Sequence, residues 1–106
     1  MTTRHFNRLS EIDEARVWNW LDNPYGTALV INGPAASGKT FLARLLSEIV
    51  FKLYGRRPAV YDNCELSVMR CDLLSGNINI IIQLDGLPAI GPNIPYIDIK
   101  VSNQNL

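Results

Sequence analysis

The stretch Gly33-Pro34-Ala35-Ala36-Ser37-Gly38-Lys39-Thr40 decides the fold of this chain. It fits every fixed position of the pattern G-x-x-x-x-G-K-[ST], in which a loop turns from a strand into a helix. The apolar run from Ala28 to Ile31 predicts the strand, and the apolar spacing from Phe41 to Leu46 predicts the helix. Such a loop aims consecutive backbone N–H groups and the positive end of the helix dipole at one point. The stretch therefore predicts an anion-binding loop.

The residues of the loop indicate which anion it binds. Gly33 and Gly38 carry no Cβ and let the backbone wrap closely around a ligand. Lys39 supplies a mobile positive charge for terminal phosphates, and Thr40 supplies a hydroxyl that can ligate the Mg²⁺ of a nucleoside triphosphate. The candidate nucleotide-binding residues are Gly33, Pro34, Ala35, Ala36, Ser37, Gly38, Lys39, Thr40 and Phe41.

Composition is typical of a soluble globular protein. The chain has 106 residues, is 47% hydrophobic and 19% charged, and has a formal net charge of +0. That length fits a single domain over residues 1–106, with a helical lead-in at 1–26 and a core at 27–103. The zero net charge gives no support to a duplex-binding module. No apolar run approaches the roughly 20 residues of a membrane span, so we expect a cytoplasmic protein without membrane contact.

Hydrophobic periodicity predicts helices alternating with strands on both sides of the loop. Expected helices cover about Glu11 to Leu21, Lys39 to Tyr54 and Cys64 to Leu74, and expected strands cover Thr27 to Asn32, Ala59 to Asp62, Ile78 to Leu84 and Tyr96 to Ser102. This order predicts an α/β fold with three layers. A mostly parallel sheet of about four strands would carry helices on both faces.

Local signals set the expected details of the helices. Ser10 is the expected N-cap of the first helix, and Gly55 is placed to end the second helix in a left-handed cap. Cys64 and Cys71 would lie two helical turns apart, which is too far for a disulfide and fits a reducing cytoplasm. The stripe expected to pack the first helix on the sheet consists of Ile12, Ala15, Trp18 and Leu21, widened by Val17 and Trp20.

The connection between the third and fourth predicted strands leaves their pairing open. Residues 87–95 hold three prolines and cannot form a regular helix. A parallel neighbour would require the chain to travel back over roughly 23 Å. Parallel neighbours usually use a dozen or more residues for this crossover. The fourth strand could therefore run alongside or against the third.

Polar residues are expected where the last two strands end. Asp85 directly follows the third predicted strand, at the edge where the carboxyl ends of parallel strands meet the loop, which makes it the natural magnesium partner of Thr40. Together, the loop and Asp85 make the chain resemble the additional-strand P-loop ATPases, the group that includes AAA+ proteins. Within that group, the chain resembles the superfamily-three helicases of small viruses and plasmids. Gly33 to Thr40 looks like the Walker A of that family, and Ile80 to Asp85 looks like its Walker B strand.

The resemblance implies roles for individual residues. Ile99 to Asn103 is similar to the strand of the family that ends in a polar sensor residue. By resemblance, Lys39 would bind the β- and γ-phosphates, and Thr40 and Asp85 would hold the metal. Asn103 would position the attacking water, so that Lys39, Asp85 and Asn103 are the candidate catalytic residues. The resemblance also implies ATP as the nucleotide and Mg²⁺ as the metal.

The chain departs from that family in ways that bear on turnover. Gly86 stands where the family usually has a second acidic residue, so we expect slow or absent hydrolysis. The sequence ends at residue 106, before the fifth strand and the arginine finger of the family, so we expect a domain truncated after the fourth strand. Asp85-Gly86-Leu87 also resembles the Walker B of signalling NTPases related to apoptotic and innate-immune switches, which points toward switching.

These observations predict an ATP-binding domain, at most a slow ATPase, whose nucleotide state controls assembly or a partner. The expected partners are further copies of the chain in an oligomer, a single-stranded nucleic acid or another protein. The compact size would suit helicase-like replication in a phage or mobile element. Two alternatives stay open: a small nucleotide or nucleoside kinase with Asp62 as the base, and a non-catalytic interaction protein that keeps the P-loop fold.

Overall fold

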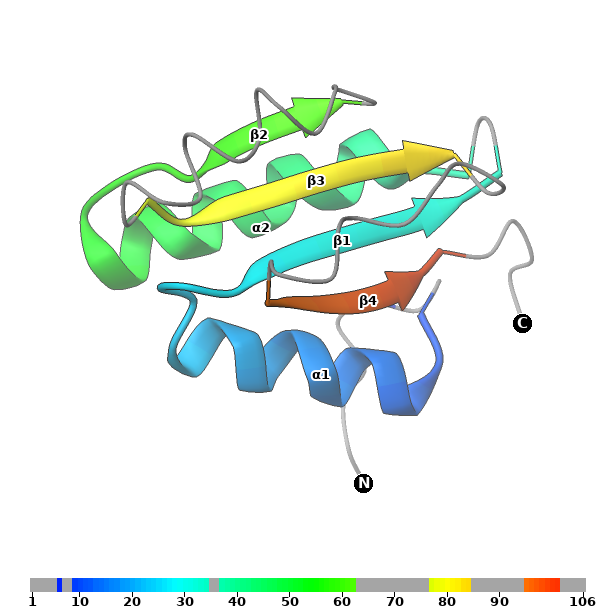
Figure 1. The fold of residues 1–106 in the computed structure, drawn as a ribbon, viewed down its shortest axis with the longest axis horizontal. Helices are drawn as coiled ribbons and strands as arrows, with labels where there is room; N and C mark the ends of the chain where they lie inside the picture. The colour runs from blue at the N-terminus through cyan, green and yellow to red at the C-terminus, as the bar shows by residue number, and fades with distance from the viewer. Residues whose placement is uncertain (1–5, 7–8, 35–36, 63–76, 85–94, 102–106) are drawn as a thin grey trace.

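The structure is a computed structural model that describes residues 6, 9–34, 37–62, 77–84 and 95–101. In chain order the elements are α1 (Glu11–Asp22), β1 (Ala28–Gly33), α2 (Lys39–Tyr54), β2 (Ala59–Asp62), β3 (Asn79–Leu84) and β4 (Tyr96–Lys100), as Figure 1 shows. Every element predicted in this part of the chain is present, and α2 and β2 have their predicted bounds. The helix predicted from Cys64 to Leu74, with both cysteines, lies outside the described residues.

The four described strands form one sheet in the order β2-β3-β1-β4, and every pairing is parallel (Figure 1). The prediction of an α/β fold with a parallel sheet is confirmed. The expectation that β3 and β4 are neighbours is wrong, because β1 lies between them. Leu29 is paired with Ile80 of β3 on one side and with Ile97 of β4 on the other. β3 and β4 therefore lie on opposite sides of β1, and all four described strands end at the same edge.

The central position of β1 and β3 explains their sequences. Ala28, Leu29, Val30 and Ile31 are all buried, and so are Ile80, Ile81 and Ile82. A parallel strand with neighbours on both sides and both faces covered requires such a continuous apolar run. β4, at the edge, has the predicted alternation, with Ile99 buried and Asp98 and Lys100 exposed. Its pairing with β1 extends one residue further, where the Val101 N–H donates to the Asn32 carbonyl at 2.7 Å.

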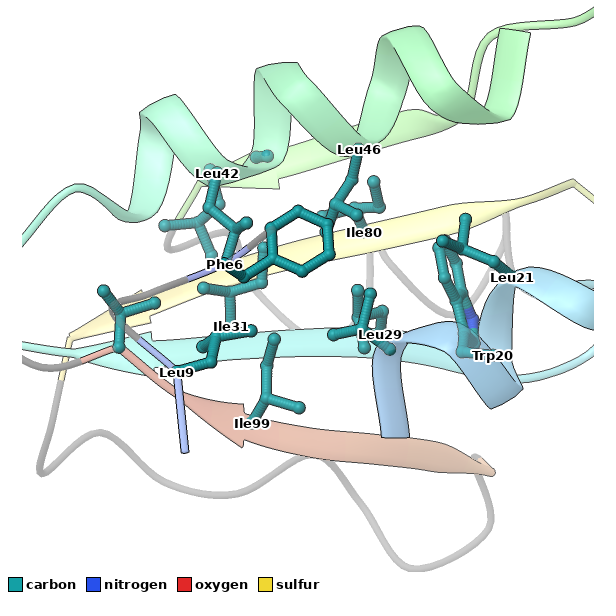
Figure 2. Close-up of a cluster of buried hydrophobic side chains, with 14 of the residues drawn as sticks. Phe6, Leu9, Trp20, Leu21, Leu29, Ile31, Leu42, Leu46, Ile80 and Ile99 are labelled. Carbon is teal, nitrogen blue, oxygen red and sulfur yellow. The ribbon is translucent and has the colours of Figure 1, made fainter. Parts of the chain in front are cut away.

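Both described helices pack on the same face of the sheet. Figure 2 shows Trp20 and Leu21 of α1 and Leu42 and Leu46 of α2 around strand residues of one hydrophobic cluster, among them Leu29, Ile31, Ile80 and Ile99. The opposite face carries a separate cluster of Ala28, Val30, Tyr61 and Ile81. The described part of the chain therefore shows one helical layer. The predicted helix from Cys64 to Leu74 is outside that part, so helices on both faces stay a prediction.

The rotation of α1 differs from the predicted stripe. Its buried residues are Glu14, Val17, Trp20 and Leu21. Ile12 is 69% exposed and Trp18 is 38% exposed. The Trp20 indole N–H donates to the Thr27 carbonyl at 2.7 Å, which holds this face of the helix against the start of β1. The predicted caps are confirmed, since the Ser10 hydroxyl accepts from the Asp13 N–H and Gly55 has a left-handed φ of 73°.

Candidate functional site

The predicted anion-binding loop begins at the middle of the sheet edge. β1 ends at Gly33, whose Cα is paired with Leu84, the last residue of β3. On the other side, Asn32 is paired with Lys100, the last residue of β4. In parallel α/β sheets, ligands bind outside the carboxyl ends of the strands. The loop therefore lies where the carboxyl ends of the three neighbouring strands β3, β1 and β4 come together.

Gly33 is buried between the loop and the end of β4. A Cβ at this position would lie 2.8 Å from the Ser37 hydroxyl oxygen and 2.9 Å from the Val101 carbonyl oxygen. Both distances are too short for a carbon atom. Glycine is thus required here by space, because the backbone of β4 and the side chain of Ser37 approach it directly.

Gly38 serves the loop in a different way. Its φ of 94° lies in the left-handed region, which residues with a side chain rarely adopt. This conformation turns the chain into α2, and the Gly38 carbonyl accepts the first helical hydrogen bond from the Leu42 N–H at 3.0 Å. The loop is therefore shaped by one glycine that leaves room and another that permits the turn.

The N-terminus of α2 differs from that of α1 in its charge and capping. The Ser10 side chain caps α1, and Glu11, Asp13 and Glu14 stand in its first turn. α2 has no side-chain cap at Gly38 and no acidic residue in its first turn. The first N–H groups of a helix have no intrahelical partner, and the helix dipole makes this end positive. Among the described residues, acidic side chains and a cap balance this end in α1, whereas the first turn of α2 has neither.

Lys39 folds back over the loop that precedes it. It is only 8% exposed. Its ammonium donates to the Gly33 carbonyl at 3.0 Å and to the Pro34 carbonyl at 2.6 Å. These oxygens are uncharged, and within the described residues Lys39 forms no ion pair. A buried positive charge without a counter-charge is costly, so an anion bound at the loop would be stabilised by it.

The two residues that follow Lys39 are exposed to solvent. Thr40 is exposed, and Phe41 is 73% exposed. Ser37, by contrast, is fully buried. Thr40 borders a cavity of ≈ 400 Å³ between α2 and strands β2 and β3. Its lining consists of Thr40, Ala43, Arg44, Ser47, Glu48, Arg57, Val60 and Ile82.

Neither this cavity nor a role for Arg44 was predicted from the sequence. Arg44 follows Thr40 by four residues, and residues at this spacing share one side of a helix. That spacing was the available signal for Arg44. No local signal could have located Val60 and Ile82, because their position beside α2 depends on the order of the strands.

Several predicted site residues lie outside the described part of the chain. These residues are Ala35, Ala36, Asp85 and Asn103. Asp85 directly follows Leu84, the residue paired with Gly33, and β4 runs parallel to β1 toward the same edge. The roles of Asp85 and Asn103 remain predictions. Among the described residues, no group of three or more His, Cys, Asp or Glu side chains could hold a metal.

Asp62, the candidate base of the kinase alternative, ends β2. It is exposed and is paired with Ile82 of β3, so β3 separates it from the strand that leads into the loop. It does not line the cavity beside Thr40. The structure therefore brings Gly33, Ser37, Gly38, Lys39 and Thr40 together and places Asp62 to one side.

Comparisons with known proteins do not assign the chain to a family. A scan against family models found no match, and searches of curated proteins and of solved structures found no significant similarity. In the part of the chain that the structure describes, no helix is long and apolar enough to cross a membrane. The function must therefore be argued from the loop itself.

Proposed function

We propose that the loop from Gly33 to Thr40 binds the polyphosphate of a nucleoside triphosphate, ATP by resemblance, together with Mg²⁺. The observation that carries this proposal is Lys39: a buried ammonium group held over the loop by the Gly33 and Pro34 carbonyls, with no counter-ion in the described residues. A bound polyphosphate would supply the missing negative charge. It would also accept hydrogen bonds from the uncapped N–H groups at the start of α2.

Each residue of the loop has a defined task in this proposal. The N–H groups of α2's first turn bind phosphate oxygens, and Lys39 exchanges its carbonyl partners for the terminal phosphates. Gly33 keeps the loop close to the end of β4, and Gly38 sets the direction in which α2 starts. Binding therefore uses groups that are already oriented, which lowers the entropic cost of association.

The residues at the loop also fit a magnesium ion. Mg²⁺ prefers hard oxygen ligands and usually takes one or two protein oxygens beside those of the phosphates. The exposed Thr40 hydroxyl is such an oxygen, and the Asp85 carboxylate is the second proposed ligand. When bound, the ion would neutralise phosphate charge. Asn103 would orient a water molecule at the same edge of the sheet.

We propose further that bound nucleotide controls assembly with other copies of the chain or with a partner. The supporting feature is Gly86, which replaces the acidic residue expected to activate water and thus favours slow turnover. Sedimentation velocity with ATP, with ADP and without nucleotide should show different oligomeric states. Identical sedimentation in all three conditions would contradict control of self-assembly. Transfer of labelled phosphate to a nucleoside, rather than release to water, would instead support the kinase alternative.

The binding proposal is tested with Lys39→Ala. We expect ATP·Mg²⁺ affinity to fall about 10- to 100-fold, because charged hydrogen bonds are worth about 1.5–3 kcal/mol. Isothermal titration calorimetry gives the affinities. Lys52→Ala is the matched control, since Lys52 lies in the last turn of the same helix and is exposed. Equal affinities for the parent and Lys39→Ala, with both proteins folded by circular dichroism, would refute the proposal.

A further inference from the structure

The cavity adjoins the loop, because Thr40 is the last residue of the loop and also part of the cavity lining. Three of its lining residues are apolar: Ala43 of α2, Val60 of β2 and Ile82 of β3. Its rim is polar and includes Thr40, Arg44, Ser47, Glu48 and Arg57. A volume of ≈ 400 Å³ lies in the range of small-molecule sites, which combine apolar walls with a few polar groups.

The two arginines of the rim differ in their interactions. Arg57 donates to the Glu48 carboxylate at 2.9 Å, and its guanidinium lies 4.7 Å from the centre of the Phe51 ring. Arg44 is exposed and has no hydrogen bond or ion pair to any described residue. Glu48 is already paired with Arg57, so within the described residues no carboxylate forms an ion pair with Arg44.

The geometry of a helix directs Arg44 toward the loop. Helical side chains tilt toward the N-terminus and cover the turn that precedes their own Cα. For Arg44 that turn contains Thr40, and both residues line the same cavity. This geometry directs the side chain of Arg44 toward the end of the cavity where Thr40 lies. A planar fork of N–H donors is suited to bind phosphate oxygens in pairs.

We propose that this cavity is an anion site in which Arg44 binds a phosphate group. The proposal rests on the proposed function, because the nucleotide brings phosphate to the adjacent loop. The phosphate has two potential sources. It belongs either to the terminal phosphate of the bound nucleotide, or to a second phosphorylated small molecule whose apolar part rests on Val60 and Ile82.

The experiment measures three affinities by isothermal titration calorimetry in the presence of Mg²⁺. ATP and ADP are titrated separately, and inorganic phosphate is titrated into protein saturated with ADP. Each titration is made with the parent, Arg44→Ala and Arg56→Ala. Arg56 is the matched control, since it is an exposed arginine outside the cavity that donates to the Asn77 side chain at 3.3 Å.

Two results would support the proposal and identify the source. If Arg44 binds the terminal phosphate, Arg44→Ala weakens ATP about tenfold or more and leaves ADP within about twofold. If it binds a second molecule, Arg44→Ala leaves both nucleotides unchanged and abolishes phosphate binding to the ADP-loaded protein. In both cases Arg56→Ala should behave like the parent.

Other results would overturn it. Unchanged affinities in Arg44→Ala for all three ligands would show that the cavity is no anion site, and so would an equal loss for ATP and ADP with phosphate binding retained. If the parent binds neither nucleotide, the proposed function fails by itself. Inorganic phosphate titrated into free parent and free Arg44→Ala then tests the cavity alone, and equal binding or no binding by both would refute it.

Discussion

Gly33 shows how one residue links the loop to the rest of the sheet. Gly33→Ala would place a Cβ against the Val101 carbonyl oxygen at 2.9 Å, and that oxygen belongs to the backbone at the end of β4. Either the loop or β4 must shift. Overpacking of this kind costs about 1–3 kcal/mol. We expect the free energy of unfolding in urea to fall by that amount, and nucleotide affinity to fall with it, because the displaced loop carries the phosphate-binding groups.

Gly55→Ala is the control for this prediction. Gly55 has a φ of 73° at the end of α2, and a Cβ there would meet nothing within 4 Å. The alanine should cost about 1–2 kcal/mol through backbone conformation alone. Nucleotide affinity should not change. Equal effects of the two variants on affinity would show that the close approach at Gly33 does not shape the loop.

The two glycines of the motif also show what the sequence can predict at this scale. The motif predicted that both Gly33 and Gly38 are required by close wrapping of the backbone. Gly38 is required by its left-handed φ of 94°, which is a local property of the turn. Gly33 is required by the approach of Val101, which is distant in the sequence. The motif identified both positions, but the reason for Gly33 becomes visible only in the fold.

At the scale of elements, side chains of α1 cover the free edge of β4. The Lys100 N–H donates to the Asp13 carboxylate at 3.1 Å, and Arg16 donates to the Asp98 carbonyl at 3.1 Å. Unpaired backbone groups on an edge strand are open to pairing with another chain. α1 thus binds the sheet in two ways: Asp13 and Arg16 form hydrogen bonds to the β4 backbone, and Val17, Trp20 and Leu21 pack in the hydrophobic cluster.

Asp13→Ala tests this role of α1. The variant removes the carboxylate that accepts from the Lys100 N–H, and it keeps the N-cap, since the Ser10 hydroxyl accepts from the backbone N–H of residue 13. Glu11→Ala is the control, because it removes an equal charge from the same helical turn. We expect Asp13→Ala to lower the free energy of unfolding by about 1 kcal/mol more than Glu11→Ala. If urea titrations show the same loss of unfolding free energy in both variants, Asp13 acts through its charge alone and its hydrogen bond to Lys100 adds no stability.

The bounds of the helices could be predicted, whereas the rotation of α1 could not. Ser10 and Gly55 are local signals, and the caps they predict are present. Because apolar residues surround much of α1, the predicted face held both Ile12 and Trp18, which are exposed, and Val17, Trp20 and Leu21, which are buried. Contacts distant in sequence, such as that of Asp13 with Lys100, decide between them.

At the scale of the whole molecule, the order of the strands could not be predicted from the sequence. Apolar runs predicted that β1 and β3 are buried, but the same pattern allows several neighbours for β4. The structure pairs β4 with β1, so the loop after β1 has β3 on one side and β4 on the other. Gly33, Leu84 and Val101 thereby meet, although each belongs to a different strand segment.

The meeting of these strand ends at the loop predicts how nucleotide affects the stability of the fold. The loop contacts segments that are far apart in sequence, so the site exists in the folded chain and is lost on unfolding. A ligand that binds only the folded state at 100 times its Kd stabilises it by about 2.7 kcal/mol. For a domain of this size we expect ATP·Mg²⁺ to raise the Tm by about 10 °C, measured by calorimetry. Lys52→Ala should keep the shift and Lys39→Ala should lose most of it; an equal shift in both variants would mean that ATP stabilises the fold from some site other than the loop.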